Sequence, residues 1–141
     1  MSEEYVGTKF KTIFLERRVP PHIGIKELIK WGKVLDSKGL APSYGNGSAG
    51  NLSFRTEISF IITASHSHLG KLTPRDFTEV VECDSNTKVL KVIGEKEPSS
   101  ESIMHFLIYD SREEVGAIFH FHDDSILKNA EALELPITCL L

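Results

Sequence analysis

The order of apolar segments along the chain is the feature that most restricts its fold. A helix is predicted over residues 23–38, because apolar residues recur on one helical face and Gly39 follows as a stop. The apolar residues of that face are Ile25, Leu28, Ile29, Val34 and Leu35. Short β-like runs and a second helix follow. Helices interspersed with hairpins favour a mixed, largely antiparallel sheet covered by helices.

The β-like runs are short and are separated by turn formers. Segments 52–55 and 60–63 predict one hairpin, and segments 77–83 and 88–93 predict another around Asp84-Ser85-Asn86. Further strands are expected over 115–122 and 135–141, and residues 1–20 form a lead-in with no assigned structure.

Two helix starts carry capping signals. Thr73 followed by Pro74 is typical of a capped first turn. Ser99 or Ser100 is expected to cap the second helix, whose apolar positions begin at Ile103. A shorter helix is predicted over 125–133.

Composition limits the class of protein. The 141 residues are 40% hydrophobic and 26% charged, which suits a single domain, residues 1–141, that folds without disulfides. Sixteen Lys and Arg against twenty Asp and Glu give a net charge of −4, so a general nucleic-acid binder is not expected.

Cys83 and Cys139 are expected to be reduced thiols. No apolar run reaches membrane length and no signal peptide is evident, so we expect a cytoplasmic protein with no membrane partner.

A glycine-rich turn matches a nucleotide-binding pattern only in its spacing. Gly45, Gly47 and Gly50 follow G-x-G-x-x-G, but they come after a helix and before a strand, the reverse of a dinucleotide site. The turn either lets backbone N–H groups converge on an anion or is a plain turn.

His120 and His122 give the strongest local signal for chemistry. Residues two apart on a strand point to the same face, so the two imidazoles suit a divalent metal, although a pair of satisfied polar residues is the alternative. Asp123 and Asp124 either orient an imidazole or cap a helix. His66 and His68 form a weaker pair in a loop, for metal or substrate contact.

The start of the second helix offers a carboxylate beside hydroxyls. Glu101 is expected in the first turn, where the helix dipole alone would favour its charge. Ser99 and Ser100 stand beside helix N–H groups, an arrangement that holds phosphate. His105 is either a further ligand or, as a lone histidine on an apolar helix, a packed residue.

Five motifs in order resemble the class II aldolase/adducin family. They are Gly50–Arg55, Ile62–Ser65, Lys71–Thr73, Pro98–Glu101 and His120–His122. The resemblance implies an α/β fold, an α/β/α sandwich with a mainly antiparallel central sheet, assembled as a homo-oligomer. It also implies a small sugar phosphate as substrate, cleaved through a metal-stabilised enediolate.

The resemblance also implies roles for particular residues. Glu101 matches the acid/base carboxylate, and His120 and His122 match two of three histidines that hold Zn²⁺, with another divalent metal as an alternative. Asn51, Ser65, Ser99 and Ser100 match positions that line the substrate phosphate. The third histidine belongs to a segment beyond Leu141, so we expect a domain short of the usual C-terminal segment.

Two departures keep other functions open. His66 stands where the phosphate loop usually has glycine, so its ring either hinders a phosphate or contacts a phosphate or carboxylate as an imidazolium. Without the third histidine, the chain is a weaker metalloenzyme, an inactive, adducin-like binding domain or one piece of a longer or split protein. Dehydratases, epimerases and decarboxylases are further alternatives, because the fold does not choose among them.

Overall fold

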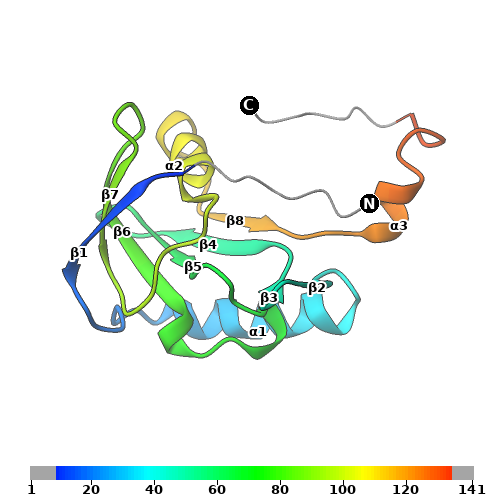
Figure 1. Ribbon diagram of the computed structural model, residues 1–141, viewed down its shortest axis with the longest axis horizontal. Helices are drawn as coiled ribbons and strands as arrows, with labels where there is room; N and C mark the ends of the chain where they lie inside the picture. The colour runs from blue at the N-terminus through cyan, green and yellow to red at the C-terminus, as the bar shows by residue number, and fades with distance from the viewer. Residues whose placement is uncertain (1–8, 135–141) are drawn as a thin grey trace.

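The computed structural model describes residues 9–134, and their central feature is a six-stranded sheet (Figure 1). The strands lie in the order β1-β7-β6-β5-β4-β8. Their bounds are β1 Lys11–Glu16, β4 Asn51–Arg55, β5 Phe60–Thr63, β6 Phe77–Asp84, β7 Val89–Ile93 and β8 Ala117–His120. Only β1 and β7 pair in parallel, and the other neighbours are antiparallel. The mixed, mostly antiparallel sheet is therefore confirmed.

Helices and short turns complete the fold. The helices are α1 Gly24–Ser37, α2 Ser102–Ser111 and α3 Asp124–Lys128, and two 3₁₀ turns are η1 Leu69–Lys71 and η2 Pro74–Asp76. A small hairpin, β2 Ser43–Tyr44 and β3 Gly47–Ser48, precedes β4. No helix within residues 9–134 is long and apolar enough to cross a membrane.

The alternation of side chains along β5 builds a separate core on each face of the sheet. Ile61 packs with Leu28 of α1, whereas Phe60 and Ile62 pack with Ile103 of α2. Successive residues of a strand point to opposite faces, so one four-residue strand serves both cores. Figure 1 shows α1 and α2 separated by the sheet. The α/β/α sandwich of the family stays a prediction in its detail.

Four sequence predictions need correction. The lead-in contains β1, which pairs with a strand far away in sequence. The turn after Thr73 is a single 3₁₀ turn with a capping box, not a longer helix. The helix predicted over 125–133 is α3, which ends at Lys128 and buries no residue, so little packing supports its extension. The strand predicted over 115–122 is β8, which is shorter. The strand predicted over 135–141 lies outside the described residues, as does Cys139.

Gly32 lets α1 approach η1 closely. A Cβ added there would lie 2.3 Å from the carbonyl oxygen of Leu69 and 2.9 Å from Leu72 Cδ1. We expect Gly32→Ala to lower the free energy of unfolding by about 1–3 kcal/mol, because backbone must move to admit the methyl group. Urea denaturation measures this change.

Gly116 provides the matched control for this substitution. A Cβ there meets nothing within 4 Å, so Gly116→Ala should change the free energy of unfolding by less than about 0.5 kcal/mol. Equal stability of the two variants would show that α1 and η1 are not packed this tightly.

Candidate functional site

The pairing of β4 with β8 brings the first two site residues together. Asn51 opens β4 and is the register partner of His120, which ends β8. Gly50 makes the close approach possible, because its φ is +91° and a Cβ would lie 2.4 Å from the His120 carbonyl oxygen. Residues far apart in sequence thus meet at one end of the sheet.

Two loops lie beside this end of the sheet and are joined by backbone hydrogen bonds. The Ser65 N–H donates to the Glu97 carbonyl at 2.9 Å, and the Ser99 N–H donates to the Thr63 carbonyl at 3.0 Å. Ala64 and Pro98 form an isolated bridge between the same loops. The serines that precede α2 are therefore held next to the loop that follows β5.

The glycine-rich turn packs against the loop that follows β5. A Cβ on Gly47 would lie 2.6 Å from the His66 carbonyl oxygen and 2.5 Å from that of Ser67. His66 has φ +62°, a left-handed conformation that glycine adopts most easily and that histidine tolerates better than most residues. His66 thus occupies a position with glycine-like backbone geometry.

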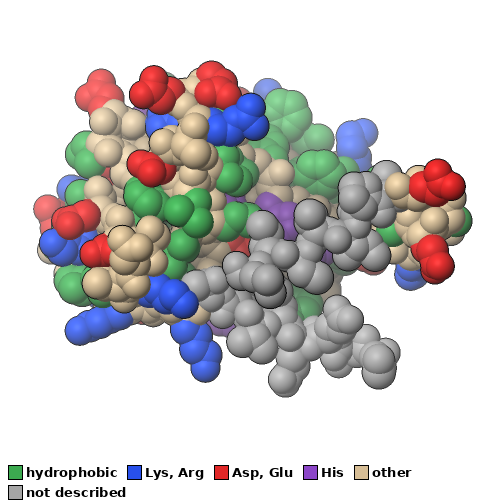
Figure 2. All heavy atoms as spheres, turned by 90° about the horizontal axis from the view of Figure 1, so that it is seen from above, with side chains coloured by type: hydrophobic (Ala, Val, Ile, Leu, Met, Phe, Trp, Pro, Cys, Tyr) green, Lys and Arg blue, Asp and Glu red, His purple; other side chains and the backbone are tan. Residues whose placement is uncertain are grey.

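These segments enclose a cavity of about 1090 Å³. Every residue predicted from the sequence as catalytic, substrate-binding or metal-binding lines it, namely Asn51, Ser65, Ser99, Ser100, Glu101, His120 and His122. Figure 2 shows histidine side chains reaching the surface in the middle of one face of the molecule. The structure brings the predicted residues together, while their individual roles stay predictions.

Glu101 is the polar centre of the cavity. Its Oε2 accepts hydrogen bonds from Asn51 Nδ2 and His120 Nδ1, each at 2.5 Å. The side chain of Glu101 is 12% exposed and that of His120 is 32% exposed. Glu101 lies one position before α2, not inside its first turn, and its N–H donates to Ser99 Oγ at 3.3 Å. Glu101, and not Ser99 or Ser100 as predicted, is therefore the N-cap of α2, while Ser99 holds the backbone of Glu101 and lines the cavity.

The two imidazoles lie side by side as the strand spacing predicts. Their ring centroids are 4.9 Å apart with the planes tilted by 32°. His122 lies beyond the end of β8, where its N–H donates to the Leu40 carbonyl at 2.9 Å. Burial, followed by the charge of His120, lowers the pKa of His122, although Glu101 and Asp124 oppose the shift. A neutral imidazole is the form that binds metal.

The donor set fits part of a metal site. In the neutral form of His120, a proton on Nδ1 that is donated to Glu101 leaves on Nε2 the lone pair that a metal needs. Zinc takes imidazole ligands but usually has four ligands in all. Across residues 9–134, no group of three or more His, Cys, Asp or Glu side chains could hold a metal ion. The described residues thus offer two neighbouring imidazoles and no complete set of ligands.

Several other polar residues noted in the sequence have local structural contacts. His68 Nδ1 accepts from the Gly70 N–H at 3.1 Å and caps η1. Asp123 Oδ1 accepts from the Ile126 N–H at 3.1 Å and caps α3. His105 is completely buried, as the packed alternative predicts. Of the second histidine pair, only His66 lines the cavity.

Three polar residues at or beneath the cavity were not identified as site residues from the sequence. Ser53 and Tyr109 lie below it, and Ser67 lines it with a buried hydroxyl that has no hydrogen-bond partner among the described residues. One signal was available, because Glu101, His105 and Tyr109 are spaced four apart and therefore share a helix face.

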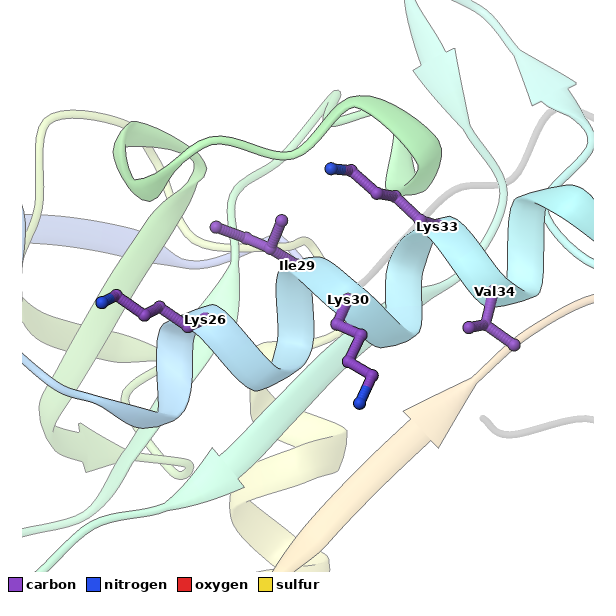
Figure 3. A pocket seen from close by; sticks show the side chains of 5 residues that line it. All are labelled: Lys26, Ile29, Lys30, Lys33 and Val34. Carbon is purple, nitrogen blue, oxygen red and sulfur yellow. The ribbon is translucent and has the colours of Figure 1, made fainter.

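A second hollow has no comparable chemistry. It occupies about 480 Å³ on the outer surface of α1 and is lined by Lys26, Ile29, Lys30, Lys33 and Val34. Figure 3 shows the Lys30 side chain pointing in a different direction from those of Lys26 and Lys33. The hollow lacks the acid, hydroxyl and imidazole groups of the first cavity.

A known family matches most of the chain. Residues 26–135 match the family described as Class II Aldolase and Adducin N-terminal domain. Among solved structures, an L-fuculose 1-phosphate aldolase superposes with a TM-score of 0.61 and 31% identity, over 79% of this chain and 50% of that protein. Both findings agree with the resemblance seen in the five motifs.

Curated relatives carry several enzyme names. A methylthioribulose-1-phosphate dehydratase of Pseudoalteromonas translucida is 37% identical over 98 residues, which cover 70% of this chain and 42% of that protein. A 5-deoxy-D-ribulose 1-phosphate aldolase of Bacillus thuringiensis is 32% identical over 99 residues, covering 69% of this chain and 42% of that protein. The chain spans about half the length of these relatives.

Proposed function

The chain belongs to the class II aldolase and adducin N-terminal domain family, and on this premise we propose that it is a zinc-dependent, aldolase-type lyase for a small sugar phosphate. The observation that carries the proposal is the position of Glu101 Oε2, at 2.5 Å from both Asn51 Nδ2 and His120 Nδ1. A carboxylate held by two donors beside paired imidazoles suits proton transfer next to a metal. The names of the relatives support a phosphorylated sugar as substrate.

In this proposal, His120 and His122 hold the divalent metal. The Nδ1–H of His120 donates to Glu101, which fixes the tautomer that leaves Nε2 for the metal. Zinc, when bound, would stabilise negative charge on the substrate oxygens. Ligands in addition to the two imidazoles would come from outside the described residues or from solvent.

Glu101 is proposed as the acid/base. Aldol cleavage takes a proton from the hydroxyl group that becomes the aldehyde and leaves an electron pair on a carbon next to the carbonyl group, where a positioned acid must deliver a proton. In the reverse direction the Glu101 carboxylate accepts the proton from that carbon. Asn51 and His120 hold Oε2, so the carboxylate does not need to be ordered during the reaction.

Hydroxyl groups around the cavity support a bound phosphate. Ser65, Ser99 and Ser100 line the cavity next to the start of α2, where the helix dipole favours an anion. The buried Ser67 hydroxyl has no partner among residues 9–134, and a phosphate oxygen would give it one. We propose His66 as an additional contact to the anion.

Dehydration of a related substrate is the second candidate. The relative with 37% identity is named as a dehydratase of a ketose 1-phosphate. Removal of water also needs a proton transfer at a carbon next to a carbonyl group, so Glu101 and the imidazoles would serve both reactions. The products distinguish them, because aldol cleavage yields two carbon fragments and dehydration yields one.

Metal binding is the first test of the proposal. Titration of zinc into the metal-free chain, followed by calorimetry, should reveal one site, and His120→Ala should weaken it by at least about tenfold because an imidazole ligand is lost. His22→Ala is the matched control, since His22 is an exposed histidine outside the cavity. Absence of binding, or equal loss in both variants, would contradict the metal site.

Turnover is the second part of the same experiment. L-Fuculose 1-phosphate, 5-deoxy-D-ribulose 1-phosphate and methylthioribulose 1-phosphate form a panel drawn from the names of the relatives. We expect aldehyde release from at least one of them with zinc present. A homo-oligomeric assembly and a cytoplasmic location stay predictions beside this proposal.

A further inference from the structure

Polar side chains continue from the cavity into the interior in one unbroken series. Asn51 Oδ1 lies 2.6 Å from His105 Nε2, and His105 Nδ1 lies 2.7 Å from Ser53 Oγ. Ser53 Oγ lies 2.7 Å from the Tyr109 hydroxyl. All four side chains are at most 6% exposed. The proposed chemistry uses Asn51 and Glu101 but has no task for the three deeper residues.

The series arises because a helix and a strand have matching spacings. Glu101, His105 and Tyr109 lie four apart at the start of and along α2, a rise of about 6 Å per step. Asn51 and Ser53 lie two apart on β4, a rise of about 6.6 Å. The two faces therefore interleave, so that each strand side chain bonds to two helix side chains in succession.

The Asn51 NH₂ group donates to Glu101 Oε2, and this contact fixes the direction of the hydrogen bonds that follow. A carboxylate only accepts, so the NH₂ group of Asn51 must face Glu101 and its carbonyl oxygen must face His105. His105 Nε2 must then carry a proton. In a neutral imidazole the other nitrogen accepts, so Ser53 donates to Nδ1 and in turn accepts from the Tyr109 hydroxyl.

We infer that His105 is a positioning residue that holds the Asn51 amide with its NH₂ group toward Glu101. This inference rests on the proposed function, in which Glu101 is the acid/base. Without the Nε2–H of His105, the Asn51 side chain could turn over and place its carbonyl oxygen against the carboxylate. Ser53 and Tyr109 act through His105, because Ser53 donates to Nδ1 while the ring proton on Nε2 faces the Asn51 carbonyl oxygen.

The environment of His105 favours one protonation state. Burial is the main cause that lowers its pKa to about 4, with the charge of His120 adding to the shift and Glu101 opposing it. At neutral pH the ring is therefore neutral and has one donor and one acceptor. A doubly protonated ring would have no acceptor for the Ser53 hydroxyl.

The tautomer of His105 can be measured without any catalytic assay. Long-range ¹H–¹⁵N spectra of the metal-free chain should show the proton on Nε2, and Ser53→Ala should shift the His105 ring nitrogens and the Asn51 side-chain amide protons. Thr78→Val is the matched control, because Thr78 is a completely buried hydroxyl that donates to the Lys96 carbonyl elsewhere. A proton on Nδ1 in the unsubstituted chain would overturn the inference.

A pair of amide substitutions tests the effect on catalysis. His105→Gln keeps a donor near the position of Nε2, whereas His105→Asn keeps a polar group only near that of Nδ1. With the substrate from the panel that the unsubstituted chain cleaves fastest, His105→Asn should lower kcat at least about tenfold with little change in KM. His105→Gln should stay within about threefold. Equal loss of kcat in both variants would overturn the positioning role.

The two measurements separate this inference from the proposed function. A chain that turns over no substrate but shows the expected tautomer and the Ser53→Ala shift contradicts the enzyme proposal and leaves the hydrogen-bond series standing. A chain that turns over a substrate but carries the His105 proton on Nδ1 supports the enzyme proposal and contradicts the positioning role of His105.

Discussion

Glu101→Gln should lower kcat by about 10²–10⁴-fold while leaving zinc affinity within a few-fold of the unsubstituted chain. Glutamine has nearly the same shape, so its carbonyl oxygen can still accept from Asn51 Nδ2 and His120 Nδ1, the two donors that hold Oε2. An amide cannot carry the proton that the reaction moves. Steady-state assays of aldehyde release and a zinc titration measure the two quantities.

Glu82→Gln is the matched control for the loss of one carboxylate. Glu82 lies on β6, away from the cavity, and its Oε2 accepts from Lys91 Nζ at 2.9 Å in an exposed ion pair. This substitution should leave kcat unchanged. Full activity of Glu101→Gln would exclude Glu101 as the acid/base. If the unsubstituted chain and both variants all bind a ligand but turn over no substrate, the binding-domain alternative is favoured.

Protonation of His105 should by itself lower the free energy of unfolding by about 3 kcal/mol between pH 7 and pH 4. Burial lowers the pKa of His105 from 6.5 to about 4 in the folded chain, so the unfolded chain binds more protons in this interval. Stability is complete above pH 6.5 and is lost as the pH falls toward 4. The figure follows from the shift at about 1.4 kcal/mol per pKa unit.

Substitution of His105 isolates its part of the pH dependence. Urea denaturation of the metal-free chain at several values between pH 7 and pH 4 should give a weaker pH dependence for His105→Gln. Burial also lowers the pKa of His122, and its contribution, which has the same sign, remains in the variant. His22→Gln serves as the control and should keep the full dependence. Identical slopes for His105→Gln and the unsubstituted chain would contradict a buried, neutral His105.

The sequence predicted those elements whose pattern is local. The amphipathic face of α1 and the alternation in β4 are complete within a few residues, so periodicity was enough to place them. β1 escaped prediction because its parallel partner is β7, with Lys11 opposite Val89. The end of α3 was misplaced because helix propensity continues past Lys128 while no buried contact supports it.

The candidate site shows the same division. Two-residue spacing on a strand correctly predicted that the His120 and His122 rings would be neighbours. The motifs led to the Class II Aldolase and Adducin N-terminal domain family, which residues 26–135 match. Neither the strand spacing nor the motifs revealed the hydrogen bonds of His105, because these bonds depend on how α2 is placed along β4.

The sequence by itself predicted most of the sheet-and-helix pattern, the family and a set of polar residues that line one cavity, since each depends on local periodicity or on short motifs. Only the tertiary structure decided that Asn51, Glu101 and His120 share hydrogen bonds across 50 and 19 positions of sequence. Contacts of this kind follow from strand register and helix docking, which the burial of two apolar cores fixes for the whole chain at once.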